Sequence, residues 1–385
     1  MIKKLKKHKI ILFAIGLVLC FGAKVFDLGS EVGSRVVVTG IGIDKTDEGY
    51  RISAQVFTPQ IDGTKTQKKS VVTADGSTIG FAVAQLSLKT GRVATASHCK
   101  LIVLGQSLLD GNVLDPLNYF VTDLEINWGA VVVATGGAAE DTISGLNELE
   151  QNAEFNWQEF LNNNREVDVI AVNSIREIML QAQDKSKSFL LTVLDVKKGE
   201  AQSPPTDGGK QEETSGVSGG EQASLSAGER TAVFSDGVKS GELTMQEMRG
   251  YSWLDRDVRK ADFEVKTNDG IAVVRLKNKI LTVRCDSEEG LPVMRVRLNL
   301  YFDVTDLPGE IFQQGAPNKL EQAIADTVAE DILSCDAAAK TLGVDVLGVN
   351  DRFYRFDKGT FDRLGEKLFS QARIEISVKA TLSVT

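Results

Sequence analysis

Apolar and polar residues alternate over long stretches of the second half of the chain, and this pattern restricts the fold most. Between Met294 and Val304 every second residue is apolar, and Leu281–Cys285 and Ile374–Val384 follow the same period. Side chains on a β-strand point alternately to the two faces of its sheet. These segments therefore predict a sheet with one solvated face and one apolar face that another layer must cover.

A long helix with one apolar stripe lies between the last two of these strand segments, which end at Val304 and begin at Ile374. A second, shorter helix is predicted over Phe361–Phe369. The stripe repeats at helical spacing, so we expect it to pack on the apolar face of the sheet. Its residues are Leu320, Ile324, Val328, Ile332, Cys335 and Ala339.

The first half of the chain mixes strand and helix patterns. Arg35–Ile43 and Tyr50–Val56 predict a hairpin. A helix capped by Asp75 or Ser77 is expected next. Further predicted elements are strands over Leu101–Leu104, Ala130–Ala134 and Phe189–Val196, a helix over 138–150, and more helix within 106–120 and 157–183. Together with the second half, this grouping indicates an α+β fold, with mixed or antiparallel sheets and packed helices in two or more domains.

The N-terminus combines a cationic cluster with a short apolar run. Five lysines lie between Lys3 and Lys9, and the run Ile10–Gly22 follows them. This order is typical of a signal peptide or a signal anchor. The run extends to Phe26 if Lys24 reaches the lipid headgroups. We therefore expect residues 1–26 to direct the rest of the chain out of the cytoplasm.

Composition changes sharply between residues 199 and 228. This stretch contains Pro204-Pro205, two glycine pairs and almost no large apolar side chain. Such a segment buries too little surface to offset the entropy lost on ordering. The predicted organisation is a signal peptide or signal anchor over 1–26, an N-terminal domain over 27–198, a flexible linker over 199–228 and a C-terminal domain over 229–385.

The bulk composition argues against several functions. The net charge of −9 and the lack of a basic stripe beyond the first ten residues disfavour nucleic-acid binding. An acidic body also gains nothing from an anionic lipid surface. Only two histidines are present, and no pair among the four cysteines forms C-x-x-C. We expect no catalytic, metal or cofactor-binding residues, and no cofactor.

Two residue pairs resemble reaction centres but have simpler interpretations. His98 and Cys99 are adjacent, and adjacent residues on a strand point to opposite faces, so they cannot form a dyad. We expect one of them to be buried and His98 to be structural. Asp123 and Glu125 lie in a polar connection, where solvated side chains are expected.

Two glycine pairs resemble phosphate-binding turns. Gly40-Ile41-Gly42 lacks the third glycine of a dinucleotide loop, and a strand follows it where a helix is required. Gly136-Gly137 precedes a helix, and a tight strand-to-helix turn explains it.

Cys285 and Cys335 fall on predicted core faces, where we expect free cysteines that pack as small apolar groups; a disulfide outside the cell is the alternative.

Several short motifs, taken in order, resemble one known family. The first motif ends in G-I-D, the second begins a helix with G-x-T-I, and the third has the pattern S-H-x-K. The fourth runs from A-V-F to R-G, the fifth has the pattern D-hydrophobic-x-G, and the sixth precedes the last strand. They lie at Glu31–Asp44, Gly76–Ala82, Ser97–Gly105, Ala232–Gly250, Asp345–Gly348 and Leu364–Phe369. In this order they resemble the Ger(x)C family, the C subunits of spore germinant receptors. We expect Gly250, which ends the fourth motif, to adopt a positive φ.

The resemblance implies a non-catalytic subunit of a receptor in the inner membrane of the spore, facing outside the cytoplasm. It implies a permease-like B subunit and a membrane A subunit as partners, and contact with membrane lipid through the N-terminus. Family members usually carry a lipid on a cysteine just before the acidic residue that opens the first motif, here Glu31. In this chain no cysteine lies at the corresponding place, near Phe26. Cys20 is the candidate for lipidation, although Leu19 occupies the position of a small residue. Lipidation of Cys20 and an uncleaved signal anchor both stay open.

Two other functions compete with this one. An extracytoplasmic solute-binding protein would show repeated βαβ units in two similar lobes, whereas the second half here reads as a strand-rich meander. A secreted hydrolase needs a nucleophile and a base, and the exported chain offers one histidine, which leaves only carboxylate chemistry. The receptor subunit is the function that the sequence favours.

Overall fold

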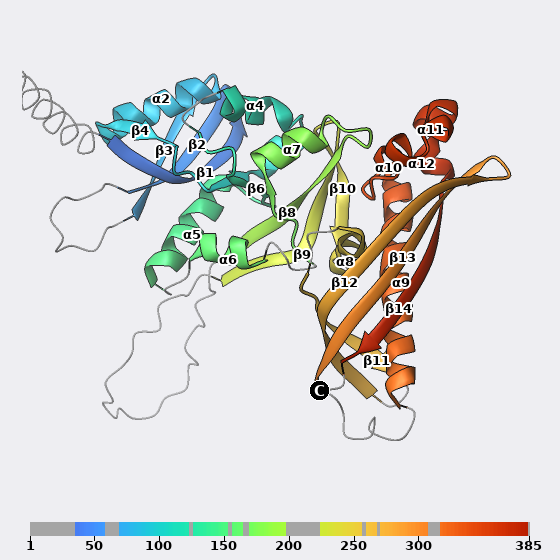
Figure 1. The fold of residues 1–385 in the computed structure, drawn as a ribbon. Helices are drawn as coiled ribbons and strands as arrows, with labels where there is room; N and C mark the ends of the chain where they lie inside the picture. The colour runs from blue at the N-terminus through green and yellow to red at the C-terminus, as the bar shows by residue number, and fades with distance from the viewer. Residues whose placement is uncertain are drawn as a thin grey trace, which may run out of the picture.

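The computed structural model describes two β-sheets with helices packed on them (Figure 1). It describes residues 35–57, 69–122, 126–152, 156–164, 169–197, 224–255, 259–267, 270–306 and 316–383.

The first sheet has a parallel centre and antiparallel sides. Its order is β10-β9-β8-β6-β5-β1-β2-β3, with β4 beside β1 and β7 beside β6. Strands β1, β5, β6 and β8 run parallel. The strands are β1 Arg35–Thr46, β2 Gly49–Phe57, β3 Lys69–Gly76, β4 Val93–Thr95, β5 Leu101–Leu104, β6 Val131–Ala134, β7 Asn173–Ser174, β8 Ser188–Lys197, β9 Ser224–Ser235 and β10 Val238–Thr244.

Helices cover both faces of this sheet, which explains why its central strands are apolar at every position. On β5, Ile102 and Leu104 pack with α2, α4 and α7, whereas Leu101 and Val103 pack with α5 and α6. The helices are α2 Ile79–Thr90, α3 Gln106–Leu109, α4 Leu114–Thr122, α5 Ala139–Asn152, α6 Trp157–Asn164 and α7 Ile175–Gln181. Helix α2 begins after Thr78, whose hydroxyl caps it in place of the expected Asp75 or Ser77.

The second sheet has four strands in the order β11-β12-β13-β14, and β14 runs parallel to β13. In Figure 1 the long helix α9 lies along these strands. The strands are β11 Asp262–Thr267, β12 Gly270–Glu288, β13 Leu291–Asp306 and β14 Arg373–Leu382. The helices are α8 Met245–Leu254, α9 Ala316–Leu342, α10 Val349–Phe356, α11 Lys358–Leu364, η1 Gly365–Lys367 and α12 Leu368–Gln371.

The predicted helix stripe and strand alternation are confirmed. Every residue of the stripe on α9 is buried, from Leu320 to Ala339. On β13 the alternate residues from Met294 to Phe302 are buried against it. The mixed α+β class follows from these two sheets and their helices.

Asp236 and Gly237 form a hairpin turn between β9 and β10, in the first sheet. Both turn residues have positive φ, 48° and 82°, as a two-residue hairpin turn requires. Strand β9 pairs with β8 and begins at Ser224, within the 199–228 segment. The chain therefore returns to the first sheet before it builds the second.

The helix predicted over Phe361–Phe369 is interrupted, so the prediction of one continuous helix is wrong. Gly365 has φ 53° and ψ −128°, outside the helical region, and it separates α11 from the short turns η1 and α12.

The predicted membrane segment 1–26, with Cys20, lies outside the described residues, as do Asp123 and Glu125. Among the residues that are described, no helix is both long and apolar enough to cross a bilayer.

Candidate functional site: a pocket between the two halves of the chain

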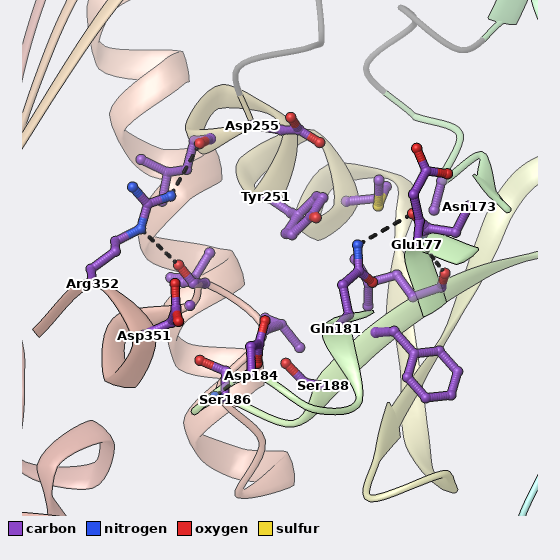
Figure 2. A pocket seen from close by; sticks show the side chains of 18 of the residues that line it. Asn173, Glu177, Gln181, Asp184, Ser186, Ser188, Tyr251, Asp255, Asp351 and Arg352 are labelled. Carbon is purple, nitrogen blue, oxygen red and sulfur yellow. Dashed lines mark hydrogen bonds between the residues drawn. The ribbon is translucent and has the colours of Figure 1, made fainter. Parts of the chain in front are cut away.

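A pocket of about 530 Å³ lies where the first half of the chain meets the second. Helix α7 and strand β8 form one wall, and α8 with α10 and the loop before it forms the other (Figure 2). The largest pocket residues on the apolar side are Phe189, Met248, Tyr251, Leu254 and Phe356. A cavity with an apolar floor and a few convergent polar groups is the usual form of a binding site.

Hydrogen bonds hold the first wall. Asn173 donates through Nδ2 to the carbonyl of Leu190 at 2.8 Å, and its Oδ1 accepts from Gln181 Nε2 at 3.4 Å. Glu177 accepts from the backbone and the hydroxyl of Ser174 and closes a capping box at the start of α7. The amide and carboxylate groups of this wall are therefore held by hydrogen bonds within the wall.

Arg352 organises the second wall. Its Nη2 donates to the carbonyl of Leu254 at 3.2 Å, and its Nε donates to the carbonyl of Leu347 at 3.3 Å (Figure 2). The guanidinium thus joins the end of α8 to the loop before α10. A neighbouring cation, Arg355, pairs with Asp351 at 2.7 Å.

Carboxylates outnumber guanidinium groups around the cavity. Glu177, Asp184, Asp255 and Asp351 line it, against Arg352 and Arg355. Burial raises the pKa of Asp184 above its ordinary value, and the Asp351 carboxylate adds to that rise, while hydrogen bonds from the backbone N–H groups of Ser186 and Lys187 oppose it.

Asp345 joins the two walls below the cavity. Its carboxylate accepts from the N–H groups of Val349 and Asn350, at 2.8 and 2.7 Å, and so caps the start of α10. Its Oδ2 also accepts from Ser186 Oγ at 2.7 Å, and its carbonyl accepts from Ser188 Oγ at 2.7 Å. Burial raises the pKa of this carboxyl group.

The pocket can bind a group rich in hydrogen-bond donors or positive charge. Its polar side consists of carboxylates, amides and hydroxyls, and no thiol or imidazole lies among the described residues that line it. Burial and the Asp255 carboxylate raise the pKa of Tyr251, so its hydroxyl stays protonated. These groups are suited to hydrogen bonding, and no nucleophile–base pair occurs among the described residues that line the pocket.

His98 and Cys99 do not line this pocket, and their side chains lie in different environments. They lie in a turn between β4 and β5, and not on a strand as predicted. Cys99 is buried and His98 is exposed, so one residue of the pair is buried, as expected. The Cys99 thiol donates to the carbonyl of Leu101 at 3.3 Å, and burial raises its pKa to about 12.

The two glycine turns have structural roles. Gly136 donates its N–H to Asp195 at 2.9 Å, and Asp195 pairs with Arg230 at 2.7 Å, so a carboxylate of the chain itself occupies that turn. Gly40 and Gly42 lie within β1, which pairs antiparallel with β2 as expected.

Cys285 and Cys335 are free and buried, as expected, and both belong to the core of the second sheet. Burial raises the pKa of Cys285 to about 12 and raises that of Cys335 as well. Thiols in this state react poorly.

The family-like motifs of the first half supply residues that connect one structural element to another. Asp44 accepts from the N–H groups of Ala139 and Glu140, at 2.9 and 3.1 Å, and so caps α5 from the end of β1. A Cβ on Gly105 would lie 1.8 Å from the Asp44 carboxylate, so only glycine fits beside it. The G-I-D and S-H-x-K motifs therefore meet at one cap.

The R-G motif joins α8 to α9. Arg249 pairs with Asp331 at 2.8 Å, and Trp253 donates to the same carboxylate oxygen at 3.3 Å. The Asp331 side chain is completely buried, and burial raises its pKa against the opposing effect of Arg249. Gly250 lies inside helix α8, so the expected positive φ is wrong. Glycine is required there because a Cβ would lie 2.0 Å from the carbonyl oxygen of Asp331.

The pocket itself was not predicted from the sequence. Among the residues around it, Met248 lies in the Ala232–Gly250 motif, and Val346, Leu347 and Gly348, with the supporting Asp345, form the D-hydrophobic-x-G step. The other residues come from four separate segments, and no local pattern links them.

Comparison with known proteins agrees with the motifs. Residues 30–196 match the family model of the spore germination protein N-terminal domain, and residues 229–385 match that of the spore germination B3/GerAC-like C-terminal domain. Spore germination protein B3 of Bacillus subtilis (strain 168) is 33% identical over 117 residues, which is 29% of this chain and 31% of that protein.

The solved crystal structure of the GerBC protein shares the fold. The TM-score is 0.57 at 16% sequence identity, and the match covers 90% of this chain and 97% of that one. Two family models thus account for most of the chain, in the order that the motifs predicted. The chain belongs to the Ger(x)C family of spore germination proteins.

Proposed function

We propose that this protein is a non-catalytic, extracytoplasmic subunit of a membrane germinant receptor that acts in nutrient-triggered spore germination. The observation that carries the proposal is the match of both halves of the chain to spore germination domains, over 30–196 and 229–385.

The use that the fold makes of the family-like motifs supports a scaffold role. Asp44 caps α5, Arg249 links α8 to α9 through its ion pair, and Asp345 joins the two walls of the pocket. Each of these charged groups is satisfied by a contact within the chain. Charged side chains used in this way shape the fold and a surface for partners.

The proposed partners are the other receptor subunits, a permease-like B subunit and a membrane A subunit. The lysine-rich start and the apolar run Ile10–Gly22 would hold the protein at the outer face of the inner spore membrane. Attachment through a lipid on Cys20 and attachment through an uncleaved anchor are both compatible with this position. The two domains and the 199–228 segment between them remain the proposed organisation.

The pocket is the one observation that favours the alternative, an extracytoplasmic solute-binding protein. However, the two sheets differ in strand number and in their helices, unlike the paired lobes of such proteins. Thermal unfolding of the purified protein with a panel of small nutrients separates the two functions. A receptor scaffold predicts no rise in unfolding temperature, and a solute-binding protein predicts a rise that depends on concentration.

Germination of mutant spores tests the proposal directly. Deleting the gene should slow the loss of refractility in response to some nutrients and leave stimuli that bypass receptors unaffected. Spores with His98→Ala or Glu125→Gln protein should germinate normally, provided that the protein accumulates. A folded His98→Ala or Glu125→Gln protein that abolished the response as completely as the deletion would instead indicate a catalytic or ligand-contact role.

A further inference from the structure

Helix α2 presents an apolar side to solvent. Phe81 and Leu88 lie two helical turns apart on the same side and are 51% and 73% exposed, and Val93 in β4 is 56% exposed. β4 is held to α2 by a hydrogen bond from the Ala94 N–H to Ser87 Oγ at 3.1 Å. Together they form one exposed apolar region at the end of the first sheet.

The same region is basic in an acidic protein. The chain has 53 acidic residues and a net charge of −9, yet no aspartate or glutamate occurs between Gly76 and Leu109. Lys89, Arg92 and Lys100 lie in that interval, and no ion pair to Arg92 or Lys100 occurs among the described residues. The net negative charge of the whole chain disfavours binding to an anionic surface, but the segment between Gly76 and Leu109 carries only positive charges.

The chain enters the fold beside this region. Arg35, the first described residue, pairs with Val93. Nine residue steps separate Phe26 from Arg35 (35 − 26), and an extended chain covers about 30 Å in that distance. An anchor that ends near Phe26 therefore keeps Val93 within about 30 Å of the membrane, a reach that allows direct contact. Figure 1 shows α2 and β4 at the end of the molecule that lies away from the second sheet.

We propose that this region, the α2 surface, rests on the outer leaflet of the membrane that holds the N-terminus. The α2 surface consists of Phe81, Leu88 and Val93 with the cations Lys89, Arg92 and Lys100. The apolar side chains lie at the level of the lipid headgroups, and the cations face anionic phosphates. This inference rests on the proposed anchor and gives the anchored domain one orientation.

Lipid is the occupant that the chemistry favours. A helix with an apolar side, flanking cations and no carboxylate of its own matches a surface of anionic headgroups over hydrocarbon, although Asp47, Glu48 and Asp75 lie beside Phe81 at the start of the helix. Each cation near such a surface adds attraction that falls off within a Debye length, so only groups held close to the membrane contribute. The connection from Phe26 to Arg35 is short enough to allow that proximity.

Fluorescence quenching by lipid tests the proposal with the full-length protein. A fluorophore is attached at Leu88→Cys in one sample and at Leu333→Cys in a matched control, both with Cys20 retained because it is the candidate lipidation site, and the signal from label on the unsubstituted protein is subtracted. Leu333 is an exposed apolar residue of α9, 50% exposed, and the described cysteines are buried. Each protein is mixed with phosphatidylcholine vesicles that contain phosphatidylglycerol and a spin-labelled phospholipid quencher, and bound protein is recovered by flotation.

We expect the fluorophore at position 88 to be quenched and the fluorophore at position 333 to keep its intensity. Protein that floats with the vesicles but shows equal intensity at both positions would overturn the α2 surface and leave the anchor intact. Protein that does not float would overturn the anchor and, with it, this inference.

A charge variant tests the electrostatic part. The triple substitution Lys89→Gln, Arg92→Gln and Lys100→Gln should weaken quenching at position 88, and so should vesicles without phosphatidylglycerol. Quenching that is unchanged in both conditions would show that the cations do not contact the lipid. A protein partner in place of lipid would give no quenching at position 88 in either kind of vesicle.

Discussion

Gly250 of α8 lies directly against the backbone of Asp331 in α9, so that a Cβ on Gly250 would be 2.0 Å from the Asp331 carbonyl oxygen. The contact brings two helices together without side chains between their backbones. Arg249, the preceding residue, pairs with the carboxylate of the same Asp331. One residue of α9 thus fixes both the distance and the register of α8.

Gly250→Val should destabilise the protein and damage germination, because the added side chain forces α8 away from α9. We expect a loss of about 1–3 kcal/mol in the free energy of unfolding, measured by urea denaturation. Gly359→Val is the control, because a Cβ on Gly359 approaches its neighbours no closer than 3.7 Å. Equal losses for the two variants would show that the close approach is unimportant.

Asp345→Ala should loosen the junction between the two walls of the pocket. It leaves the N–H groups of Val349 and Asn350 and the hydroxyl of Ser186 without their acceptor. Uncompensated buried donors cost about 1–3 kcal/mol, and α10 should show faster amide hydrogen exchange. Ser186→Ala removes one bond and keeps the helix cap, so a loss as large as that of Asp345→Ala would contradict this account.

The stability of the protein should depend on the protonation of Asp184. Its pKa is raised in the folded state, so the folded protein binds the proton more tightly than the unfolded chain. That stabilising contribution is complete below the ordinary pKa of 3.8 and is lost as pH rises through the folded pKa.

Asp184→Asn removes this dependence and keeps an acceptor oxygen for Ser186 and Lys187. The variant should therefore gain stability relative to the wild type as pH rises from about 4 to 7, as urea denaturation at both values would measure. Asp110→Asn, at an exposed position, controls for the loss of one surface charge. A stability difference that is the same at both pH values would refute the assignment.

Deleting residues 1–26 should give a soluble, folded protein, because Ile10–Gly22 is the only apolar run with membrane-type flanks. Cys20→Ala separates the two modes of attachment: it should release a lipoprotein and leave a signal anchor in the membrane. A truncated protein that still sediments with membranes lacking the partner subunits would refute the single anchor.

Brief proteolysis should cut first within the 199–228 segment, as its composition predicts. The expectation of two separate halves needs refinement, because β9 pairs with β8 along most of its length. The two fragments should therefore elute together from a sizing column and separate only in denaturant. Fragments that separate without denaturant would contradict this pairing, and preferential cutting elsewhere would contradict the boundary.

Local periodicity explains how much of the fold could be predicted. The stripe on α9 and the alternation on β13 are long, and each face sees one environment, so the pattern survives in the sequence. Helix α8 and strands β3 and β11 were not predicted. Leu254 and Met248 of α8 face the core beside polar neighbours, and the helix carries no long stripe that would reveal it.

The candidate site depended on contacts that sequence spacing does not encode. Ser186 and Asp345 are 159 residues apart and meet only because α10 packs against the turn before β8. The motif containing Asp345 was visible, but its partner was not. By contrast, the motif glycines pointed to close approaches, and the structure supplied the reason for Gly105 and Gly250.

The last pair of the β8–β9 ladder joins Lys197 to Ser224, so the chain leaves the sheet and re-enters it at neighbouring positions. The two ends of the intervening stretch are therefore fixed by the ladder whatever its length. Doubling such a loop costs only about 0.6 kcal/mol of closure entropy. Relatives can lengthen or shorten it at little thermodynamic cost, and an epitope tag or a fluorescent protein inserted there should leave both sheets intact.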